Sequence, residues 1–472
     1  MESYPKQPGR SPKRRREPSG PRAEVALDAL GGEAGGEHGR LEVGARAARM
    51  RVAPAHEQRT RCCALGRRRR AFRSAANGVE AIWSCTAGAS GSVPITRAGC
   101  YDGEAGKERD YARSLPPLLL AEHLRPALAR GGRAVVLAEE WHTVHAVLHL
   151  DWLLRREGLR DRVAILWNAN NTFGFEGIDW ERLSRAATLT TVSRYMRQKM
   201  WPLGVDPIVI PNGLEPDVYV PAFSGHVKEL QRTLHGRTVL AKVARWDPDK
   251  RWLNAIDIVA ALRGQSWRPL LIARGGAEAH GCEVLARARA LGLHVGARKL
   301  ERSGAAGLLE ATAGAQELDV LLLESHVDKS ARRLLFRGAD AVLANSGHEP
   351  FGLVGLETMA AGGLACTGGT GEDYVVPGRN GLVLQTEDPR EFLQLFAALR
   401  ADAGADTEIR RAARRTARDY AWSSIVERNL LPRVSALAGA RPSTEARISV
   451  PRRPRRPTGA QGIEAAQVPA GA

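Results

Sequence analysis

The amino-acid sequence predicts an α/β protein with two doubly wound domains, each built on a mainly parallel sheet. Residues 238–323 alternate apolar strands with amphipathic helices, and residues 95–215 show the same alternation. A repeated strand–helix order implies parallel pairing with helices covering the sheet. The chain also has 472 residues, more than a single compact core usually organises, which favours two domains.

The individual elements follow from hydrophobic period and length. In the second half, the predicted strands are 238–244, 269–273, 318–323, 339–345 and 382–385, and the predicted helices are 252–262, 278–291, 389–400, 407–420 and 423–434. In the first half, strands are predicted at 133–138 and 163–167, with a helix over 142–156 between them. The inner face of that helix is predicted to carry Val144, Leu148, Trp152 and Leu153.

The basic charge of the chain is concentrated at its two ends. Of the formal net charge of +17, residues 1–75 carry +10 and residues 441–472 carry +4, which leaves +3 for residues 76–440. The arginine runs form no known nucleic-acid-binding motif, so no specific nucleic-acid partner is expected. We predict disordered basic tails, with residues 1–94 disordered or atypical and 436–472 disordered. Such tails could contact phosphates or an anionic membrane surface without specificity.

Apolar runs and cysteine spacing predict the cellular location of the protein and whether it binds a metal. No apolar run approaches the roughly 20 residues that span a bilayer, and the basic N-terminus is not followed by a signal-peptide core. The six cysteines are scattered without metal-ligand spacing. We therefore expect a cytoplasmic protein, with peripheral membrane contact through its tails as an addition, and no metal site.

One stretch, residues 346–362, carries the strongest chemical signal. Glu349 and Glu357 stand eight positions apart around Gly352 and a predicted helix start. The amides of Gly352 and Leu353 would open the helix, and a helix N-terminus binds a diphosphate by hydrogen bonds and its dipole. Glu349 could then accept hydrogen bonds from sugar hydroxyls, and Glu357 from the hydroxyls of a ribose. Ordinary acidic residues on a core-packed helix are the alternative.

A second signal follows the strand over 238–244. Arg245 comes at its end and Lys250 five positions later. A guanidinium can bind two phosphate oxygens at once, and an ammonium adds a movable point charge, so the pair suits a diphosphate. Solvated loop charges are the alternative. Because ligands bind at the carboxyl ends of parallel strands, this pair and the 346–362 stretch are expected at one edge of one sheet.

Together these residues resemble the donor-binding signature of retaining glycosyltransferases of family 4. The family's E-x7-E motif matches at Glu349 and Glu357, and its diphosphate-binding Arg and Lys match at Arg245 and Lys250. The resemblance implies the GT-B architecture, in which two Rossmann-like domains face a cleft. It covers about residues 120–435 of this chain.

The resemblance also assigns the domains. Residues 95–215 correspond to an incomplete acceptor domain and residues 216–435 to the nucleotide-sugar donor domain, with a hinge near 211–214. The last helix is expected to cross back to the first domain. The family's first glycine-rich loop has only a weak counterpart, within residues 81–91.

Two acceptor-side candidates follow from the same comparison. Glu139 takes the place of a family histidine near the reacting sugar, and His142 lies three positions on. A capping or surface histidine is the alternative for His142. The loop 168–175, rich in asparagine and phenylalanine, suits a polyol acceptor, with an irregular asparagine-turn loop as the alternative.

The expected activity is transfer of a sugar from a nucleoside diphosphate sugar to a hydroxyl of a glycan, lipid or small molecule, with retention of configuration, as in hexosyltransferases. No cofactor or metal is expected, because cations and amides would stabilise the leaving diphosphate. The catalytic candidates are Glu349, Arg245, Lys250, Glu139 and His142; the donor-binding candidates are Arg245, Lys250, Glu349, Gly352, Leu353 and Glu357. An epimerase or phosphorylase on the same fold, and a non-catalytic nucleotide- or nucleic-acid-binding protein, are the alternatives.

Overall fold

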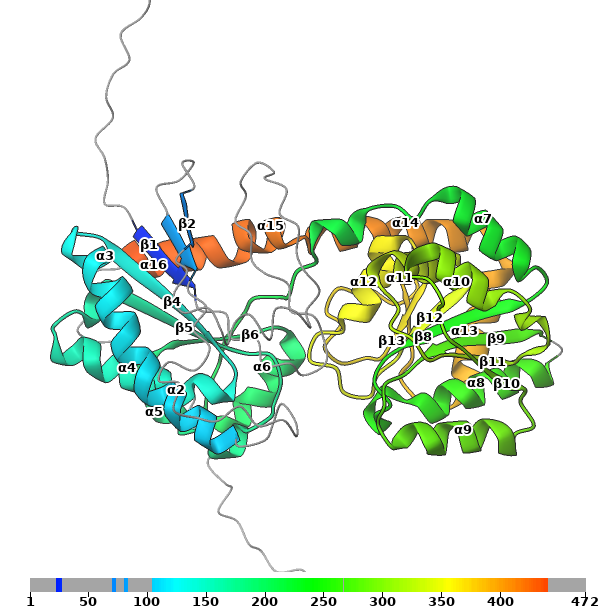
Figure 1. The fold of residues 1–472 in the computed structure, drawn as a ribbon, viewed down its shortest axis with the longest axis horizontal. Coiled ribbons are helices and arrows are strands. Elements are labelled where there is room, and N and C mark those ends of the chain that lie inside the picture. Colours follow the sequence, from blue (N-terminus) through cyan, green and yellow to red (C-terminus); the bar gives the residue numbers. More distant parts are fainter. Residues whose placement is uncertain (1–22, 28–69, 74–79, 84–103, 266, 440–472) are drawn as a thin grey trace, which may run out of the picture. The chain divides into compact units, whose positions relative to one another are not determined.

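A computed structural model of the chain describes residues 23–27, 70–73, 80–83, 104–265 and 267–439. Within these residues the strands form two seven-stranded sheets, and helices pack on both (Figure 1). All strand pairs are parallel except one at an edge of the first sheet. The predicted α/β class with two doubly wound domains is confirmed, while the domain boundaries remain predictions.

The first sheet has the spatial order β2-β3-β1-β4-β5-β6-β7. Its strands are β1 (Ala23–Leu27), β2 (Arg70–Arg73), β3 (Glu80–Trp83), β4 (Arg133–Glu139), β5 (Val163–Ala169), β6 (Thr188–Thr191) and β7 (Ile208–Val209). The α-helices that accompany it are α2 (Glu104–Leu119), α3 (Arg125–Ala129), α4 (Val144–Arg156), α5 (Trp180–Ala186) and α6 (Arg194–Met200). The shorter helical segments are η1 (Leu120–Leu124), η2 (Trp141–Thr143), η3 (Arg160–Arg162), η4 (Phe175–Gly177) and η5 (Trp201–Leu203).

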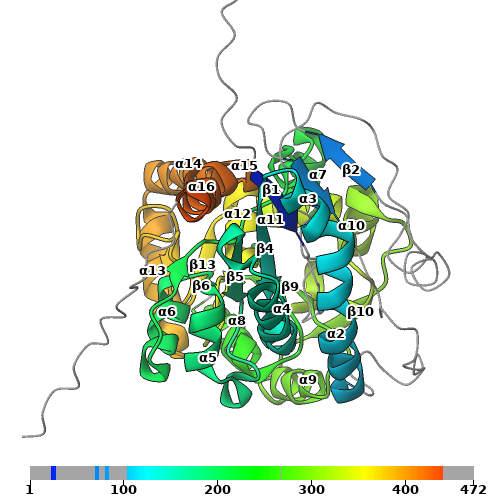
Figure 2. The same cartoon turned by 90° about the vertical axis from the view of Figure 1, so that its left-hand side faces the viewer.

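Helices α2 and α4 lie side by side on the first sheet (Figures 1 and 2). His145 of α4 contacts the Glu108 carboxylate at 2.6 Å, and His149 contacts the Ala112 carbonyl at 2.8 Å. The inner face of α4 differs from the prediction at Trp152, whose side chain is 52% exposed. The buried row instead runs through Val147, Leu150 and Leu154, because the helical period of 3.6 turns Trp152 outward when these residues face the sheet.

The first sheet also extends into the range predicted to be disordered or atypical. Strand β1 pairs in parallel with β4 and with β3, and β2 pairs antiparallel with β3. These strands have four or five residues each, too few to give a hydrophobic period among the surrounding Arg, Gly and Ala. Residues 1–22, 28–69, 74–79 and 84–103 lie outside the described residues, as does the C-terminal stretch from 440. The glycine-rich part of 81–91 is among them.

The second sheet has the order β10-β11-β9-β8-β12-β13-β14. Its strands are β8 (Thr238–Val243), β9 (Pro269–Arg274), β10 (Val295–Arg298), β11 (Val320–Leu323), β12 (Ala341–Ala344), β13 (Ala365–Thr367) and β14 (Leu382–Val383). The chain runs from β8 to β9 on one side, whereas β12 pairs with the other side of β8. The direction of strand addition therefore reverses between β8 and β12, which is where doubly wound sheets bind ligands.

Helices cover both faces of the second sheet (Figure 1). Along β8, Leu240 packs into a core with α8 and α9, whereas Val239 and Ala241 pack into a different core with α7, α10 and α11. This alternation is the period of two expected for a strand buried on both faces. The α-helices are α7 (Ser224–Thr233), α8 (Trp252–Gly264), α9 (His280–Ala290), α10 (Gly304–Thr312), α11 (Lys329–Gly338), α12 (Leu353–Ala361), α13 (Pro389–Ala401), α14 (Ala403–Asp419), α15 (Trp422–Ile425) and α16 (Leu431–Gly439). The shorter segments are η6 (Pro216–Tyr219), η7 (Pro248–Lys250), η8 (Ala315–Glu317) and η9 (Val426–Leu430).

The last helix, α16, returns to the first sheet. Its Val434 packs with Val135 of β4 and Leu166 of β5, on the face opposite α4, so the predicted crossing is confirmed. Near the predicted hinge, Leu214 accepts a hydrogen bond from Trp422 N (3.1 Å) and donates one to Tyr420 O (2.7 Å). Among the described residues, no helix combines the length and apolar character that crossing a membrane requires.

Candidate functional site

The carboxyl ends of β8 and β12 are joined by hydrogen bonds between the segments that follow them. Gly347 N donates to Asp249 O at 2.7 Å, and His348 N donates to Asp249 Oδ1 at 2.9 Å. Asp249 lies in the short helix η7, which Asp247 caps by accepting from Asp249 N at 2.9 Å. One aspartate therefore fixes the loop before α12 against the turn after β8.

This arrangement brings Lys250 and Glu349 together. Lys250 Nζ lies 2.7 Å from Glu349 Oε2, and the two side chains are only 18% and 23% exposed. Glu349 N also donates to Thr370 Oγ1 at 2.9 Å, so the carboxylate sits on a fixed backbone. Ion pairs that are partly shielded from water are stronger than surface pairs, so this contact orients both side chains.

Arg245 lies at the same end of β8 but is less constrained. Its carbonyl accepts a hydrogen bond from Trp252 Nε1 at 2.7 Å, which fixes its backbone. Its guanidinium is half-exposed, and Nη2 lies 3.9 Å from Asp247 Oδ2, at the outer limit of an ion pair. No close ion pair among the described residues therefore fixes the position of this guanidinium.

Helix α12 begins where the sequence predicts, with Gly352 as its N-cap and Leu353 as its first residue. Gly352 has φ +78°, the left-handed region that favours glycine. A Cβ there would lie 2.6 Å from Glu372 Cγ and 3.1 Å from the Tyr374 hydroxyl. That hydroxyl donates to Gly352 O. The helix N-terminus therefore depends on a residue without a side chain.

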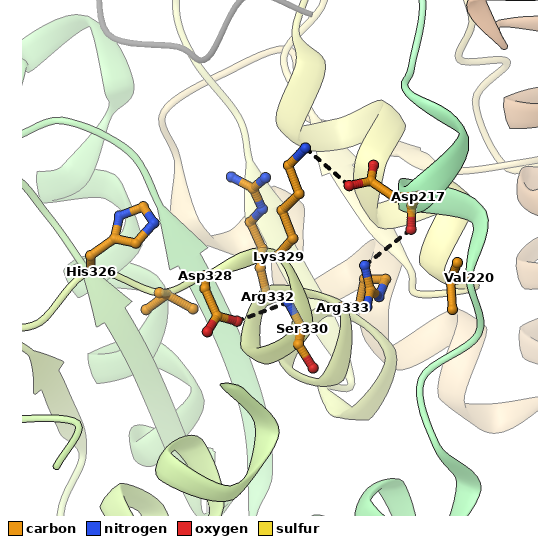
Figure 3. A pocket seen from close by; sticks show the side chains of 9 residues that line it. Asp217, Val220, His326, Asp328, Lys329, Ser330, Arg332 and Arg333 are labelled. Carbon is orange, nitrogen blue, oxygen red and sulfur yellow. Dashed lines mark hydrogen bonds and ion pairs between the residues drawn. The ribbon is translucent and has the colours of Figure 1, made fainter. Parts of the chain in front are cut away.

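Glu357 lies on α12 and pairs with Arg332 of α11, Oε2 to Nε, at 3.3 Å. Arg332, Lys329 and Arg333 line the small cavity beside Glu357 and also an adjoining pocket of about 470 Å³ (Figure 3). Asp217 also lines that pocket. Its Oδ2 lies 3.0 Å from Lys329 Nζ, and its carbonyl oxygen accepts a hydrogen bond from Arg333 Nη1 at 3.0 Å. None of these pocket-lining residues was predicted from the sequence.

Glu372 is a further carboxyl group at this site, and it was not predicted from the sequence. It is 6% exposed and packs beneath Gly352. Its Oε2 accepts from Thr370 N at 3.2 Å. Burial, and then the charge of Glu349, raise the pKa of Glu372 to about 8. The sequence signal that could have indicated Glu372 is its position as an acidic residue among small residues and glycines.

The first sheet carries the other two candidates, Glu139 and His142, at the carboxyl end of β4. Asn170 Nδ2 lies 3.5 Å from Glu139 Oε2. Burial lowers the pKa of His142, which favours its neutral form, and its ring contacts Trp141 edge-on at 5.7 Å between centroids. The structure therefore groups the donor-side candidates around β8 and β12, whereas these two belong to a different sheet.

Glu140, between them, was not predicted. It has φ +69°, a conformation that costs a non-glycine residue roughly 1–3 kcal/mol. Its carboxylate accepts from Asn170 N at 2.8 Å and from Asn171 Nδ2 at 3.0 Å. Burial raises its pKa to about 7. These bonds fix the loop after β5, on which Phe173 is 64% exposed and contacts Trp141.

Comparison with known proteins adds family information for part of the chain. Residues 310–418 match the family model "Glycosyl transferases group 1", a range that contains Glu349, Glu357 and Glu372. A glycogen synthase of Mycobacterium tuberculosis is 34% identical over 123 residues, which is 25% of this chain and 29% of that protein. A D-inositol 3-phosphate glycosyltransferase of Geodermatophilus obscurus is 30% identical over 239 residues, 49% of this chain and 48% of that protein. The chain thus matches about half the length of these relatives or less.

The fold has counterparts among solved structures. A sucrose-phosphate synthase of Thermosynechococcus elongatus superposes with a TM-score of 0.54, covering 89% of this chain and 100% of that chain at 14% identity. At such identity the likeness shows the fold alone. The predicted GT-B architecture is therefore confirmed.

The first prediction concerns Gly352. We expect Gly352→Ala to lower the thermal midpoint and weaken nucleotide binding, because a left-handed alanine costs about 1–2 kcal/mol and its Cβ would overlap Glu372. Gly378→Ala is the matched control, since Gly378 has φ +69° but no atom within 4 Å of its Cβ position. Equal loss of stability in the two variants, measured by thermal unfolding, would contradict a role for packing beneath Gly352.

The second prediction concerns the pH dependence of stability. Because the folded-state pKa of Glu372 is raised from 4.5 to about 8, its protonated form stabilises the fold fully at acidic pH, and that contribution is lost as pH rises through 8. Glu372→Gln should therefore gain stability relative to the natural chain as pH rises from about 5 to 9. Thermal unfolding across this range tests it, with the exposed Glu229→Gln as control. A pH-independent difference would disprove it.

Proposed function

We propose that this chain is a glycosyltransferase that moves a sugar from a nucleoside diphosphate sugar to an acceptor hydroxyl. The observation that carries the proposal is the 2.7 Å pair of Lys250 and Glu349, which lies at the switch point of the second sheet and next to the N-terminus of α12. A cation for phosphate, a carboxylate for hydroxyls and exposed backbone amides are the three contacts that such a donor requires.

Donor binding would replace Glu349 with a diphosphate as the partner of Lys250. A diphosphate carries more charge than a carboxylate, so it would compete with Glu349 for Lys250 and draw in the half-exposed Arg245. Glu349 would then accept hydrogen bonds from the sugar. The amides at Gly352 and Leu353 would bind oxygens of the same diphosphate. All these groups act where negative charge grows as the donor bond breaks, which lowers the barrier electrostatically.

The nucleoside would extend toward Glu357. A pocket of about 470 Å³ adjoins the cavity that Glu357 lines, and this volume lies in the range of small-molecule sites. Glu357 would accept hydrogen bonds from the ribose, and its contact with Arg332 would orient the carboxylate for that purpose. The base would occupy the adjoining pocket.

The acceptor would meet the first sheet. Asn170 and the exposed Phe173 offer hydrogen bonds and a ring face to a polyol, and Glu139 and His142 are the candidates for contact with the reacting hydroxyl. The acceptor is a glycan, lipid or small molecule with hydroxyl groups. Retention of configuration and the hexosyltransferase type rest on the resemblance of the paired glutamates. Location in the cytoplasm and membrane contact through the tails stay predictions of the sequence.

A donor screen tests the proposal directly. Thermal unfolding with UDP-, GDP- and ADP-sugars should show stabilisation by the true donor, because a ligand that binds only the native state raises its stability. Product analysis with a donor labelled in the sugar then separates transfer from isomerisation or phosphorolysis. Binding of none of the three classes would overturn the proposal.

The third prediction concerns the diphosphate contacts. Arg245→Ala and Lys250→Ala should each lower kcat by roughly 100-fold or more, because each removes a group that stabilises developing charge. The thermal midpoint should change little for Arg245→Ala, whose side chain is half-exposed. Lys228→Ala, on the exposed side of α7, serves as control. Unchanged turnover by a folded Arg245 or Lys250 variant would remove that residue from the mechanism.

The fourth prediction concerns metal ions. We propose that the two cations and the α12 amides neutralise the leaving diphosphate without a divalent metal. Transfer activity should then survive prolonged incubation with EDTA within about twofold. Loss of activity that Mg²⁺ or Mn²⁺ restores would contradict it. Arg245→Ala measured with and without Mg²⁺ provides the matched comparison, since a metal that replaces the guanidinium would rescue this variant.

A further inference from the structure

Lys242 is a buried lysine in the middle of the second sheet. It lies on β8 and is 1% exposed, an environment in which lysine almost never occurs without compensating contacts. Its Nζ donates to Leu343 O at 3.0 Å and to Asn345 Oδ1 at 2.8 Å. Both acceptors belong to β12 or to the residue just after it, so the side chain bridges the two strands of the switch point.

The contacts of Lys242 continue into the loops of the proposed donor site. Asn345, whose Oδ1 accepts from Lys242, donates through Nδ2 to Asn254 Oδ1 at 2.8 Å. Asn254 in turn donates to the Glu387 carbonyl at 2.7 Å. Asn345 begins the segment that leads to Glu349, so the amine of Lys242 fixes the base of this segment.

Charged groups of the donor site face the amine. Burial is the main reason that the pKa of Lys242 falls to about 7, and the charges of Lys250 and Arg251 lower it further. Glu349 and Cys366 act in the opposite direction. Two of these four groups, Lys250 and Glu349, are proposed to change partners when a diphosphate binds.

We propose that Lys242 is a positioning residue beneath the donor site, and that its amine takes up one proton from solvent when a nucleoside diphosphate binds. This inference rests on the proposed function. In the unbound protein, the positive charge of Lys250 disfavours a second cation in its vicinity. A bound diphosphate offsets that charge and so raises the proton affinity of the Lys242 amine. The neutral amine then becomes an ammonium, with no other bond formed or broken.

The hydrogen bonds of Lys242 suit both forms of the group. A neutral amine has two N–H donors and an ammonium has three, and the two bonds to Leu343 O and Asn345 Oδ1 need only two. Protonation therefore requires no rearrangement of β12. Above pH 7 the protein therefore carries a cation below the phosphates mainly when they are present, and largely avoids a buried charge in their absence.

A defined pH dependence follows. Because binding raises the proton affinity of Lys242, the nucleoside diphosphate binds best where the amine is already protonated. Its affinity should be constant below pH 7 and should fall as pH rises above this value. If Lys242 had a purely structural role, it would not make nucleotide affinity depend on pH in this way.

Calorimetric titration tests the inference. UDP, GDP and ADP are titrated into the natural chain at about pH 7.5 in PIPES and in imidazole, two phosphate-free buffers with different enthalpies of ionisation. The difference in heat gives the number of protons taken up. For the natural chain we expect an uptake of about half a proton or more per bound nucleotide. In Lys242→Met the uptake should be smaller by the contribution of the missing amine. Lys228→Met, at an exposed position of α7, should behave as the natural chain does.

Glu372, whose pKa is also raised, is the other buried group that could take the proton. In Glu372→Gln the uptake should persist, and its disappearance there would assign the proton to Glu372 and overturn the inference. Should Lys242→Met not fold, the natural chain decides, because equal uptake at about pH 6 and pH 7.5 overturns the inference. Binding with the same uptake in Lys242→Met and the natural chain overturns the inference alone. Failure of all three nucleotides to bind overturns the proposed function as well.

Discussion

The parallel pairing of β8 with β12 is the constraint on which the candidate site depends. Because strand addition reverses between these two strands, the segments that follow their carboxyl ends leave the sheet next to each other. Asp249 then joins the two segments through the amides of Gly347 and His348. Residues almost 100 positions apart in the chain, Lys250 and Glu349, come within 2.7 Å of each other as a result.

Burial affects the charged groups of this region as much as ion pairing does. Lys250 and Glu349 neutralise each other near the surface, whereas Lys242 and Glu372 lie deeper and each is shifted toward its neutral form. Two deep groups with pKa values of about 7 and 8 therefore lie close to the Lys250–Glu349 pair. A site arranged in this way can respond to an incoming polyanion through proton uptake, and needs no large movement of the backbone.

Much of this could be predicted from the sequence, and the omissions have physical causes. The helix start at Gly352, the strands β8, β9 and β12 and the return of α16 were predicted, because each has a clear period, a glycine or a matching motif. Strands β1 to β3 were missed because pairing, rather than local pattern, defines them: β1 pairs with β4, β3 with β1 and β2 with β3. Arg332, Glu140 and Lys242 were missed for a related reason, since their importance lies in contacts with residues distant in sequence. The face of α4 was wrong at Trp152 because its apolar residues encircle the helix.

The loop after β5 has a different kind of anchorage, with a consequence for how such a protein diversifies. It is tied to β4 mainly by the carboxylate of Glu140, which contacts Asn170 and Asn171 and leaves the following residues to point outward. Phe173 at this tip is 64% exposed and can therefore be exchanged without moving the anchoring asparagines, whereas a Cβ at the neighbouring Gly174 would lie 2.8 Å from the Trp141 ring. Under the proposed function, Phe173 is thus a position at which selection or laboratory evolution could alter the choice of acceptor while the scaffold stays intact.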